Sequence, residues 1–140
     1  MDVIASLYEA LSADDELPEL IAAHGSESAI FSGDLAPIDP GSLPYVMLGP
    51  RVSDEPDDDF DGPRDRVIDI DVRLYALASQ TSLAIDDAAE RVRAILHRAQ
   101  LPAPSGQEGP SCRVSGPVTA PTSSPEIAGR RLTARLYVKG

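Results

Sequence analysis

Residues 66–75 alternate strictly between apolar and polar side chains, and this pattern constrains the fold more than any other part of the chain. The apolar positions are Ile68, Ile70, Val72 and Leu74. Because successive side chains of a β-strand point to opposite faces, the stretch is predicted to form a strand with one face in the core and the other in water.

Residues 131–138 show the same alternation, so a second strand is predicted at the end of the chain. Its wet face is basic, with Arg131 and Arg135, whereas the wet face of the strand over residues 66–75 is acidic, with Asp69 and Asp71. If the two strands pair as antiparallel neighbours, the two aspartates can face the two arginines, each pair adding about 0.2–1 kcal/mol. We predict this pairing.

The clearest helical pattern covers residues 83–99, where apolar side chains fall on one stripe. Thr81 or Ser82 is suited to cap its start, and Arg98 is suited to the negative end of the helix dipole. Three acidic side chains lie near its start, namely Asp86, Asp87 and Glu90. We interpret them as residues that the positive end of the dipole favours rather than as a carboxylate site.

The remaining patterns predict a first amphipathic helix capped by Asp2, a short second helix near Leu17 to Ile21, and strands at 29–32, 45–48 and 112–115. Pro117 follows the last of these and is expected to place it at a sheet edge or a bulge. The expected fold is therefore a single α+β domain over residues 1–140. It should have a mostly antiparallel sheet of about four to five strands with two main helices packed on one face.

The charge balance narrows the classes of partner. The chain has 23 acidic residues against 12 lysines and arginines, so its formal net charge is −11 at pH 7. Such a chain repels phosphate overall, which argues against sequence-specific DNA binding. No apolar stretch reaches the roughly 20 residues of a membrane helix, so we expect a soluble protein made in a cytoplasm, with no membrane partner.

The run Asp57-Asp58-Asp59-Phe60-Asp61-Gly62 has the spacing of the first half of an EF-hand calcium loop. With Asp57 at position 1, the bidentate acid of position 12 would fall on Ile68, inside the predicted strand. Pro50 and Pro56 also break any helix upstream. We therefore interpret the run as an acidic hairpin tip, while a looser cation site remains an alternative.

No other residue pattern indicates catalysis, and we expect no enzyme, cofactor or metal. His24 and His97 lack partners at metal-ligand spacing, and His97 is suited to the C-terminal end of its helix. Cys112 has no companion cysteine and is expected to be a small buried apolar residue. The chain also lacks a nucleophile elbow and a phosphate-binding glycine loop.

Three segments taken together resemble the tail terminator, or tail completion, family of long-tailed phages and gene transfer agents. They are residues 7–20, residues 30–49 and residues 70–96, and the segment Leu43-Pro44-Tyr45-Val46-Met47-Leu48-Gly49 is the most specific part. The order of elements covers almost the whole chain. The resemblance implies an α+β subunit that assembles into a ring, usually a hexamer, at the head-proximal end of the tail tube.

In that family the ring ends tube polymerisation and provides the surface to which the DNA-filled head docks. The resemblance thus implies a structural protein whose partners are copies of itself, the tail tube protein, a head–tail connector protein and double-stranded DNA passing through the lumen without specific binding. It implies no catalytic residues. We hypothesise that Asp57, Asp58, Asp59 and Asp61 project toward the ring lumen or the neighbouring subunit.

Two other functions fit parts of the sequence. A protein that mimics DNA and blocks a nucleic-acid-binding enzyme would be acidic, although here the densest acidic run is confined to residues 54–65 and the final strand is basic. A divalent-cation-binding module would use the acidic loop 54–65.

Overall fold

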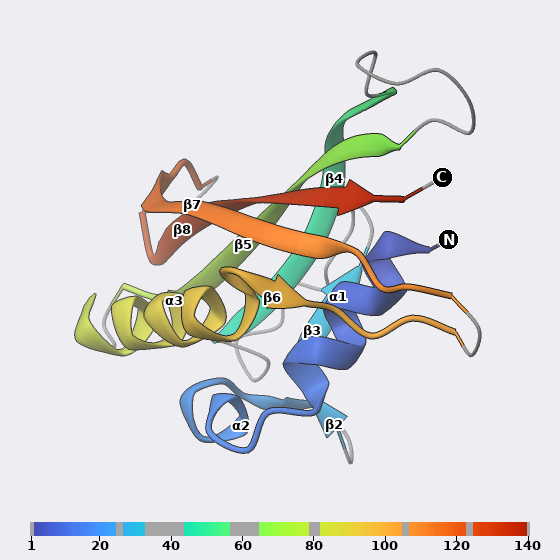
Figure 1. Ribbon diagram of the computed structural model, residues 1–140. Coiled ribbons are helices and arrows are strands. Elements are labelled where there is room, and N and C mark those ends of the chain that lie inside the picture. The colour runs from blue at the N-terminus through green and yellow to red at the C-terminus, as the bar shows by residue number, and fades with distance from the viewer. Residues whose placement is uncertain are drawn as a thin grey trace.

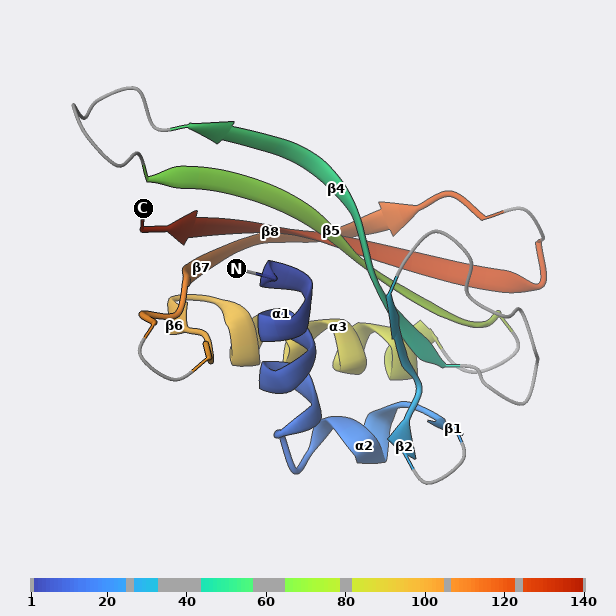
Figure 2. The ribbon, with the colours of Figure 1, turned by 90° about the vertical axis from the view of Figure 1, so that its right-hand side faces the viewer.

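A curved sheet carries the helices on one face, as the side view in Figure 2 shows. The computed structural model describes residues 2–24, 27–32, 44–56, 65–78, 82–104, 107–122 and 125–139. The helices are α1 (Val3–Ser12), α2 (Leu17–Leu20) and α3 (Ser82–Leu96). The strands are β1 (Ala23–His24), β2 (Glu27–Ser28), β3 (Ile30–Ser32), β4 (Tyr45–Pro56), β5 (Arg66–Leu77), β6 (Ala99–Gln100), β7 (Ser111–Ala120) and β8 (Ile127–Val138) (Figure 1).

Within the described residues the main sheet has six strands in the order β3-β4-β5-β8-β7-β6, and β1 and β2 form a separate pair. The α+β class and the mostly antiparallel sheet are confirmed, since only β3 runs parallel to its neighbour β4. The expected number of four to five strands was too small. The helical pattern that extends to residue 99 hid β6, which begins at Ala99.

Helix α3 ends earlier than predicted because the chain turns sharply after it. Arg98 has a φ of 62°, which is outside the helical region, and the helix ends at Leu96. The turn brings Ala99 and Gln100 back alongside β7 as the short strand β6. Arg98 therefore lies beyond the helix, and its predicted place at the end of the dipole was wrong.

The predicted pairing of β5 with β8 is confirmed along the full length of both strands. The ladder runs from Arg66 opposite Val138 to Leu77 opposite Ile127 without a register shift. Asp69 lies opposite Arg135, as predicted, but Asp71 lies opposite Thr133. The expected partner Arg131 instead lies opposite Arg73, because the register places two arginines in the same row.

The two outer long strands differ from the sequence prediction mainly in length. Strand β4 continues past the predicted end at Leu48 to Pro56, with register shifts near Arg51. Strand β7 likewise continues through Gly116 and Pro117, with a register shift between Ser115 and Val118. Pro117 was expected to place the strand at a sheet edge or a bulge, and this register shift agrees with the second alternative, since proline lacks the N–H that a regular ladder requires.

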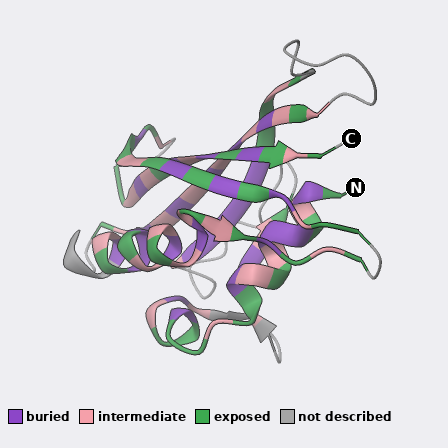
Figure 3. Ribbon diagram, viewed as in Figure 1, coloured by how far each residue is buried: buried purple, intermediate pink, exposed green. Residues whose placement is uncertain are grey.

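The core lies between the sheet and the helices. Figure 3 shows buried and exposed residues alternating along β7 and β8, as expected for strands with one covered face. The inner positions of β5 and β8 are fully or almost fully buried, and they pack with Leu7 of α1, Leu17 of α2 and Val92 of α3. Asp2 caps α1 as predicted, because its carboxylate accepts the backbone N–H of Ala5 at 3.2 Å.

One ion pair ties the first two helices to the third. Asp14 follows α1, and its carboxylate accepts hydrogen bonds from the Arg91 guanidinium of α3, one of them at 2.9 Å. The same carboxylate accepts the N–H groups of Glu16 and Leu17 at the start of α2. The hydrogen bonds from Arg91 lower the pKa of Asp14 to about 2.

We expect Leu132→Ala to lower the stability of the fold strongly. Leu132 is fully buried at the centre of β8, so the change leaves a cavity and should lower the free energy of unfolding by about 2–5 kcal/mol. Val52→Ala is the matched control, because Val52 is 58% exposed and its truncation should cost less than about 0.5 kcal/mol. Urea denaturation measures both. Equal losses for the two variants would contradict the assignment of Leu132 to the core.

We expect Asp14→Asn to destabilise the protein in a pH-dependent way. The amide keeps an oxygen for the α2 N–H groups but loses the charge that Arg91 binds, so the loss should be about 1–2 kcal/mol at neutral pH. The folded-state pKa is depressed below 3.8, so this stabilisation is present above that value and is lost as the pH falls toward about 2. Unfolding curves between pH 7 and pH 2 should therefore converge for the two proteins, and a constant difference would refute the charge effect.

Candidate assembly surface

The predicted acidic residues Asp57, Asp58, Asp59 and Asp61 lie outside the described residues. The structure does describe the strands on either side of them, β4 and β5, which pair as far as Pro56 opposite Arg66, where β5 also pairs with Val138 of β8 (Figure 2). At this end of the sheet Asp54 lies between two arginines, 2.9 Å from Arg51 and 2.6 Å from Arg66. Ile68, which would have to supply the bidentate calcium ligand, is buried on β5. In the described ranges no group of three or more histidine, cysteine, aspartate or glutamate side chains could hold a metal ion.

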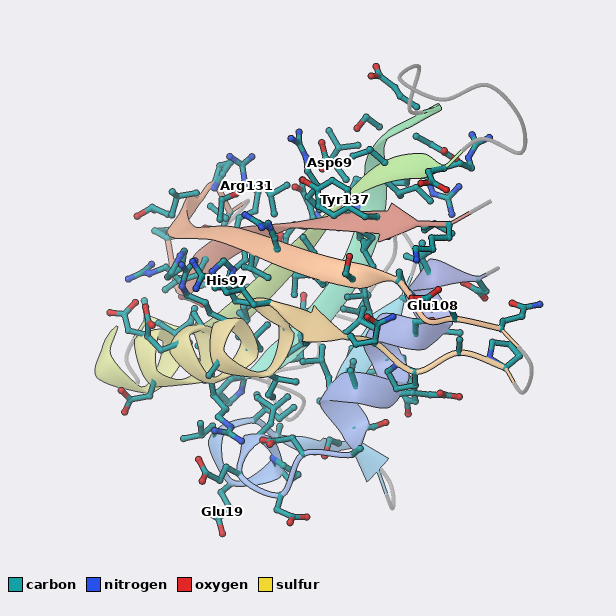
Figure 4. The ribbon with its side chains drawn as sticks, in the orientation of Figure 1. Glu19, Asp69, His97, Glu108, Arg131 and Tyr137 are labelled. Atoms are coloured by element: carbon teal, nitrogen blue, oxygen red, sulfur yellow. The ribbon has the colours of Figure 1, made fainter. Side chains whose placement is uncertain are left out.

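The face of the sheet away from the helices carries an ordered grid of side chains on β5, β8 and β7. The first row is Asp69, Arg135 and Arg113, the second is Asp71, Thr133 and Ser115, and the third is Arg73, Arg131 and Val118. We call the four arginines of this grid, Arg73, Arg113, Arg131 and Arg135, the arginine face. Figure 4 labels Asp69, Arg131 and Tyr137 on this part of the sheet.

The first row contains a complete ion pair. The Arg135 guanidinium donates two hydrogen bonds to Asp69, at 2.9 and 3.1 Å, and Ser53 of β4 donates a third at 3.1 Å. Hydrogen bonding to Arg135 lowers the pKa of Asp69. Both groups remain charged, so Arg135 is largely committed to Asp69.

The other arginines of the face are less well compensated. Arg73 donates to the Gly49 carbonyl oxygen at 3.0 Å and to the Tyr75 hydroxyl at 3.4 Å. No carboxylate of the described chain lies within ion-pair distance of Arg113 or Arg131, and both are exposed. Each has another arginine directly opposite on the neighbouring strand, which is an unfavourable arrangement.

A hollow and two exposed apolar side chains lie beside the arginine face. The hollow has a volume of about 350 Å³ and is lined by Asp69, Arg113, Val114, Ser115, Thr133, Arg135 and Tyr137. Tyr137 is 40% exposed, and Val118 in the third row is 48% exposed. Among the described residues Val52 is the remaining large apolar side chain with comparable exposure.

At the other end of the same sheet face, apolar and aromatic side chains form a second small core. Ala29, Tyr45 and Met47 are buried there. The Tyr45 ring packs edge-on against Phe31 at 5.7 Å and lies 5.4 Å from the Tyr75 ring. Gly129 lies opposite Tyr75 on β8, where an added Cβ would come within 3.2 Å of that ring. The sheet face thus combines an apolar end with a charged end.

The end of helix α3 covers the outer edge of β7. Arg93 donates to the carbonyl oxygens of Val114 and Gly116, at 2.8 and 3.0 Å. The backbone N–H of Arg98 donates to the Cys112 carbonyl, and the N–H of Val114 donates to Nδ1 of His97. These contacts occupy backbone groups that would otherwise be open to pairing with another strand.

The remaining predicted residues have structural roles. His97 follows α3 and accepts a hydrogen bond through Nδ1, so that nitrogen carries no proton; burial and the nearby Arg93, Arg98 and Arg113 lower the pKa of His97. Cys112 is buried as predicted, and burial raises the pKa of its thiol to about 12. His24 lies in β1, where the structure describes the backbone pairing alone.

The acidic residues near the start of α3 also have a structural explanation. Asp86 accepts a hydrogen bond from Arg130 of β8 at 2.8 Å, which fixes the helix to the sheet. Asp87 and Glu90 are exposed. None of the three lies in the first turn of α3, which begins at Ser82, so their predicted place at the positive end of the dipole was wrong.

The sequence pattern identified Arg131 and Arg135 as the basic face of the last strand and placed Arg73 on the outer face of its own strand, but it did not join Arg73 and Arg113 to that basic face. Arg113 alternates with the buried Cys112 and Val114, so its outward position was readable from the pattern. Its place beside Arg135 was not, because that depends on the strand order and the register. The contacts of Arg93 and His97 with β7 had no local sequence signal, since they join residues 17–23 positions apart.

None of the described helices is long and apolar enough to cross a membrane. Comparison of the sequence with curated proteins finds no match.

A solved structure described as the virion of a native gene transfer agent (GTA) particle contains a chain with a similar fold. The TM-score is 0.76 with 22% sequence identity, and the match covers 98% of this chain and 94% of the other. This likeness establishes the fold. A protein-family model, described as tail completion protein gp17, matches residues 5–134. The expected resemblance is therefore confirmed, and the chain belongs to the tail completion protein gp17 family, whose role is that of a structural protein of the phage tail.

Proposed function

We propose that this chain forms a homo-oligomeric ring, a hexamer, at the head-proximal end of a tail tube. The ring ends tube polymerisation and presents the surface to which the head docks. The family match over residues 5–134 carries this proposal, and the likeness to a chain of a gene transfer agent virion supports it. The location is a phage-like particle, assembled in a bacterial cytoplasm.

The distribution of polar groups also supports a role through interfaces. The described residues offer an ordered polar sheet face and several ion pairs, and no buried polar side chain among them lacks a partner. Strand β3 pairs with β4 only at Val46 to Leu48. From Gly49 to Pro56, strand β4 therefore has no neighbour on its outer side among the described residues. An open strand edge is a site at which another chain can add.

The partners that follow are the tail tube protein, a head–tail connector protein and double-stranded DNA that passes without specific binding. In this arrangement Asp57, Asp58, Asp59 and Asp61 project toward the lumen or the neighbouring subunit. A negative lining keeps the duplex from adhering as it passes, because like charges repel.

The first test omits this chain from particle assembly. We expect tail tubes longer than normal and heads that remain separate, because tube growth lacks its terminator. Negative-stain microscopy measures tube length and head attachment, and the purified chain should appear as rings. Tubes of normal length joined to heads would refute the proposal. Rings that require a divalent cation would instead favour a cation site in the loop 54–65.

The second test concerns the acidic loop. Replacement of Asp57, Asp58, Asp59 and Asp61 by Asn removes four negative charges from a formal total of −11. We expect intact rings that retain duplex DNA at low salt, with retention disappearing as added salt screens the charges. Gel-shift assays at two salt concentrations measure this effect. A ring structure with the loop on the outer rim would remove the lumen hypothesis and leave the ring itself unaffected.

A further inference from the structure

The arginine face is a basic surface on an acidic protein. Within the grid, four arginines and two aspartates, Asp69 and Asp71, give a net charge of +2. Since the whole chain has a formal charge of −11, the rest of it carries −13. The uncompensated positive charge is concentrated at Arg113 and Arg131, which lie on β7 and β8.

The isolated chain leaves this surface in an unfavourable state. Arg73 lies directly opposite Arg131, and Arg113 lies directly opposite Arg135. Like charges directly opposite on neighbouring strands destabilise a sheet. Carboxylates from outside the chain would relieve both contacts, and the planar guanidinium group can bind a carboxylate through two hydrogen bonds.

The apolar groups of the same surface favour a protein partner over a nucleic acid. Tyr137 and Val118 are among the most exposed large apolar side chains of the described residues, and Tyr137 borders the hollow between Arg113 and Arg135. Arginine and tyrosine are enriched at the centres of protein interfaces. A duplex would in addition meet the strong negative charge of the rest of the chain.

The chain itself offers a complementary surface. Exposed carboxylates on the three helices and on the connection between α1 and α2 have no ion-pair partner within the described part of the chain, and we call them the helix-layer carboxylates: Glu9, Asp15, Glu19, Asp87 and Glu90. Arg91, which lies in the same layer, is already bound to Asp14 and Glu16. Figure 4 shows Arg131 and Glu19 on opposite sides of helix α3.

We infer that the arginine face binds the helix-layer carboxylates of a second copy of this chain. The contact joins two different surfaces, so it is heterologous, and repetition of it generates a ring if the rotation between copies closes. This inference rests on the proposed ring and names the surfaces that build it. Arg113 and Arg131 provide the charge, and Tyr137 and Val118 provide the apolar contact area.

The test is a charge reversal on the arginine face. Arg113→Glu/Arg131→Glu should weaken self-association at least about 30-fold, as expected when charged residues at the centre of an interface are replaced. Analytical ultracentrifugation measures the association, and urea denaturation checks that the fold is intact. The variant should be no less stable than the parent chain, because both arginine–arginine contacts are removed.

Two further variants make the result specific. Lys139→Glu changes the net charge by the same amount as Arg131→Glu, but Lys139 forms one exposed ion pair with Glu108 outside the grid. Only Arg131→Glu should weaken association. Asp15→Lys/Glu19→Lys should also fail to self-associate, and mixing it with Arg113→Glu/Arg131→Glu should restore assembly, because each reversed surface then meets its complement.

Three outcomes would overturn the inference. They are a wild-type chain that stays monomeric at all concentrations, reversed variants that associate like the wild type, and a mixture that fails to reassemble. Loss of duplex DNA binding in the arginine variants with unchanged association would assign the face to nucleic acid instead. Tube length in assembled particles tests the proposed function separately, so tails that end normally without this contact would refute the inference alone.

Discussion

The register of β5 against β8 determines most of what the rest of the structure can do. These two strands form the longest unbroken ladder, from Arg66 opposite Val138 to Leu77 opposite Ile127. Because side chains alternate between faces, a slip of one residue would turn every core side chain of one strand toward water. The buried rows at Ile70 and Leu132 hold the register, and the register in turn decides which charges meet on the outer face.

The charged face follows from the core rather than from optimised charge pairing. Asp69 meets Arg135, but the next favourable match does not occur, and Arg73 meets Arg131 instead. Burial of one apolar side chain contributes about 1.5–3 kcal/mol, whereas a cross-strand charge pair contributes about 0.2–1 kcal/mol. The apolar rows therefore prevail, and the sheet accepts two arginine–arginine contacts on its exposed side.

The sequence predicted the helices and strands whose apolar residues recur with a clear period, but it did not predict contacts between segments that are distant along the chain. Alternation predicted β5 and β8, and helical spacing predicted α1 and most of α3. The end of α3 was missed because the turn at Arg98 depends on its backbone hydrogen bond to Cys112, not on a local helix breaker. The bond between Asp14 and Arg91 was equally invisible, since 77 residues separate its partners. On the surface, the dense acidic run and the basic face of the last strand were visible in the sequence, whereas the place of Arg113 beside Arg135 depends on the strand order and the register.

The ionisable groups whose pKa values are shifted have structural causes. The lowered pKa values of Asp14 and Asp69 both arise mainly from an arginine that completes a structural ion pair. The raised pKa of Cys112 arises from burial in the core. What stands out instead is the separation of charge between a basic sheet face and acidic helices. In any contact between copies, a chain with such polarity favours head-to-tail contacts over symmetric ones, because a face that meets its own copy would oppose arginine to arginine.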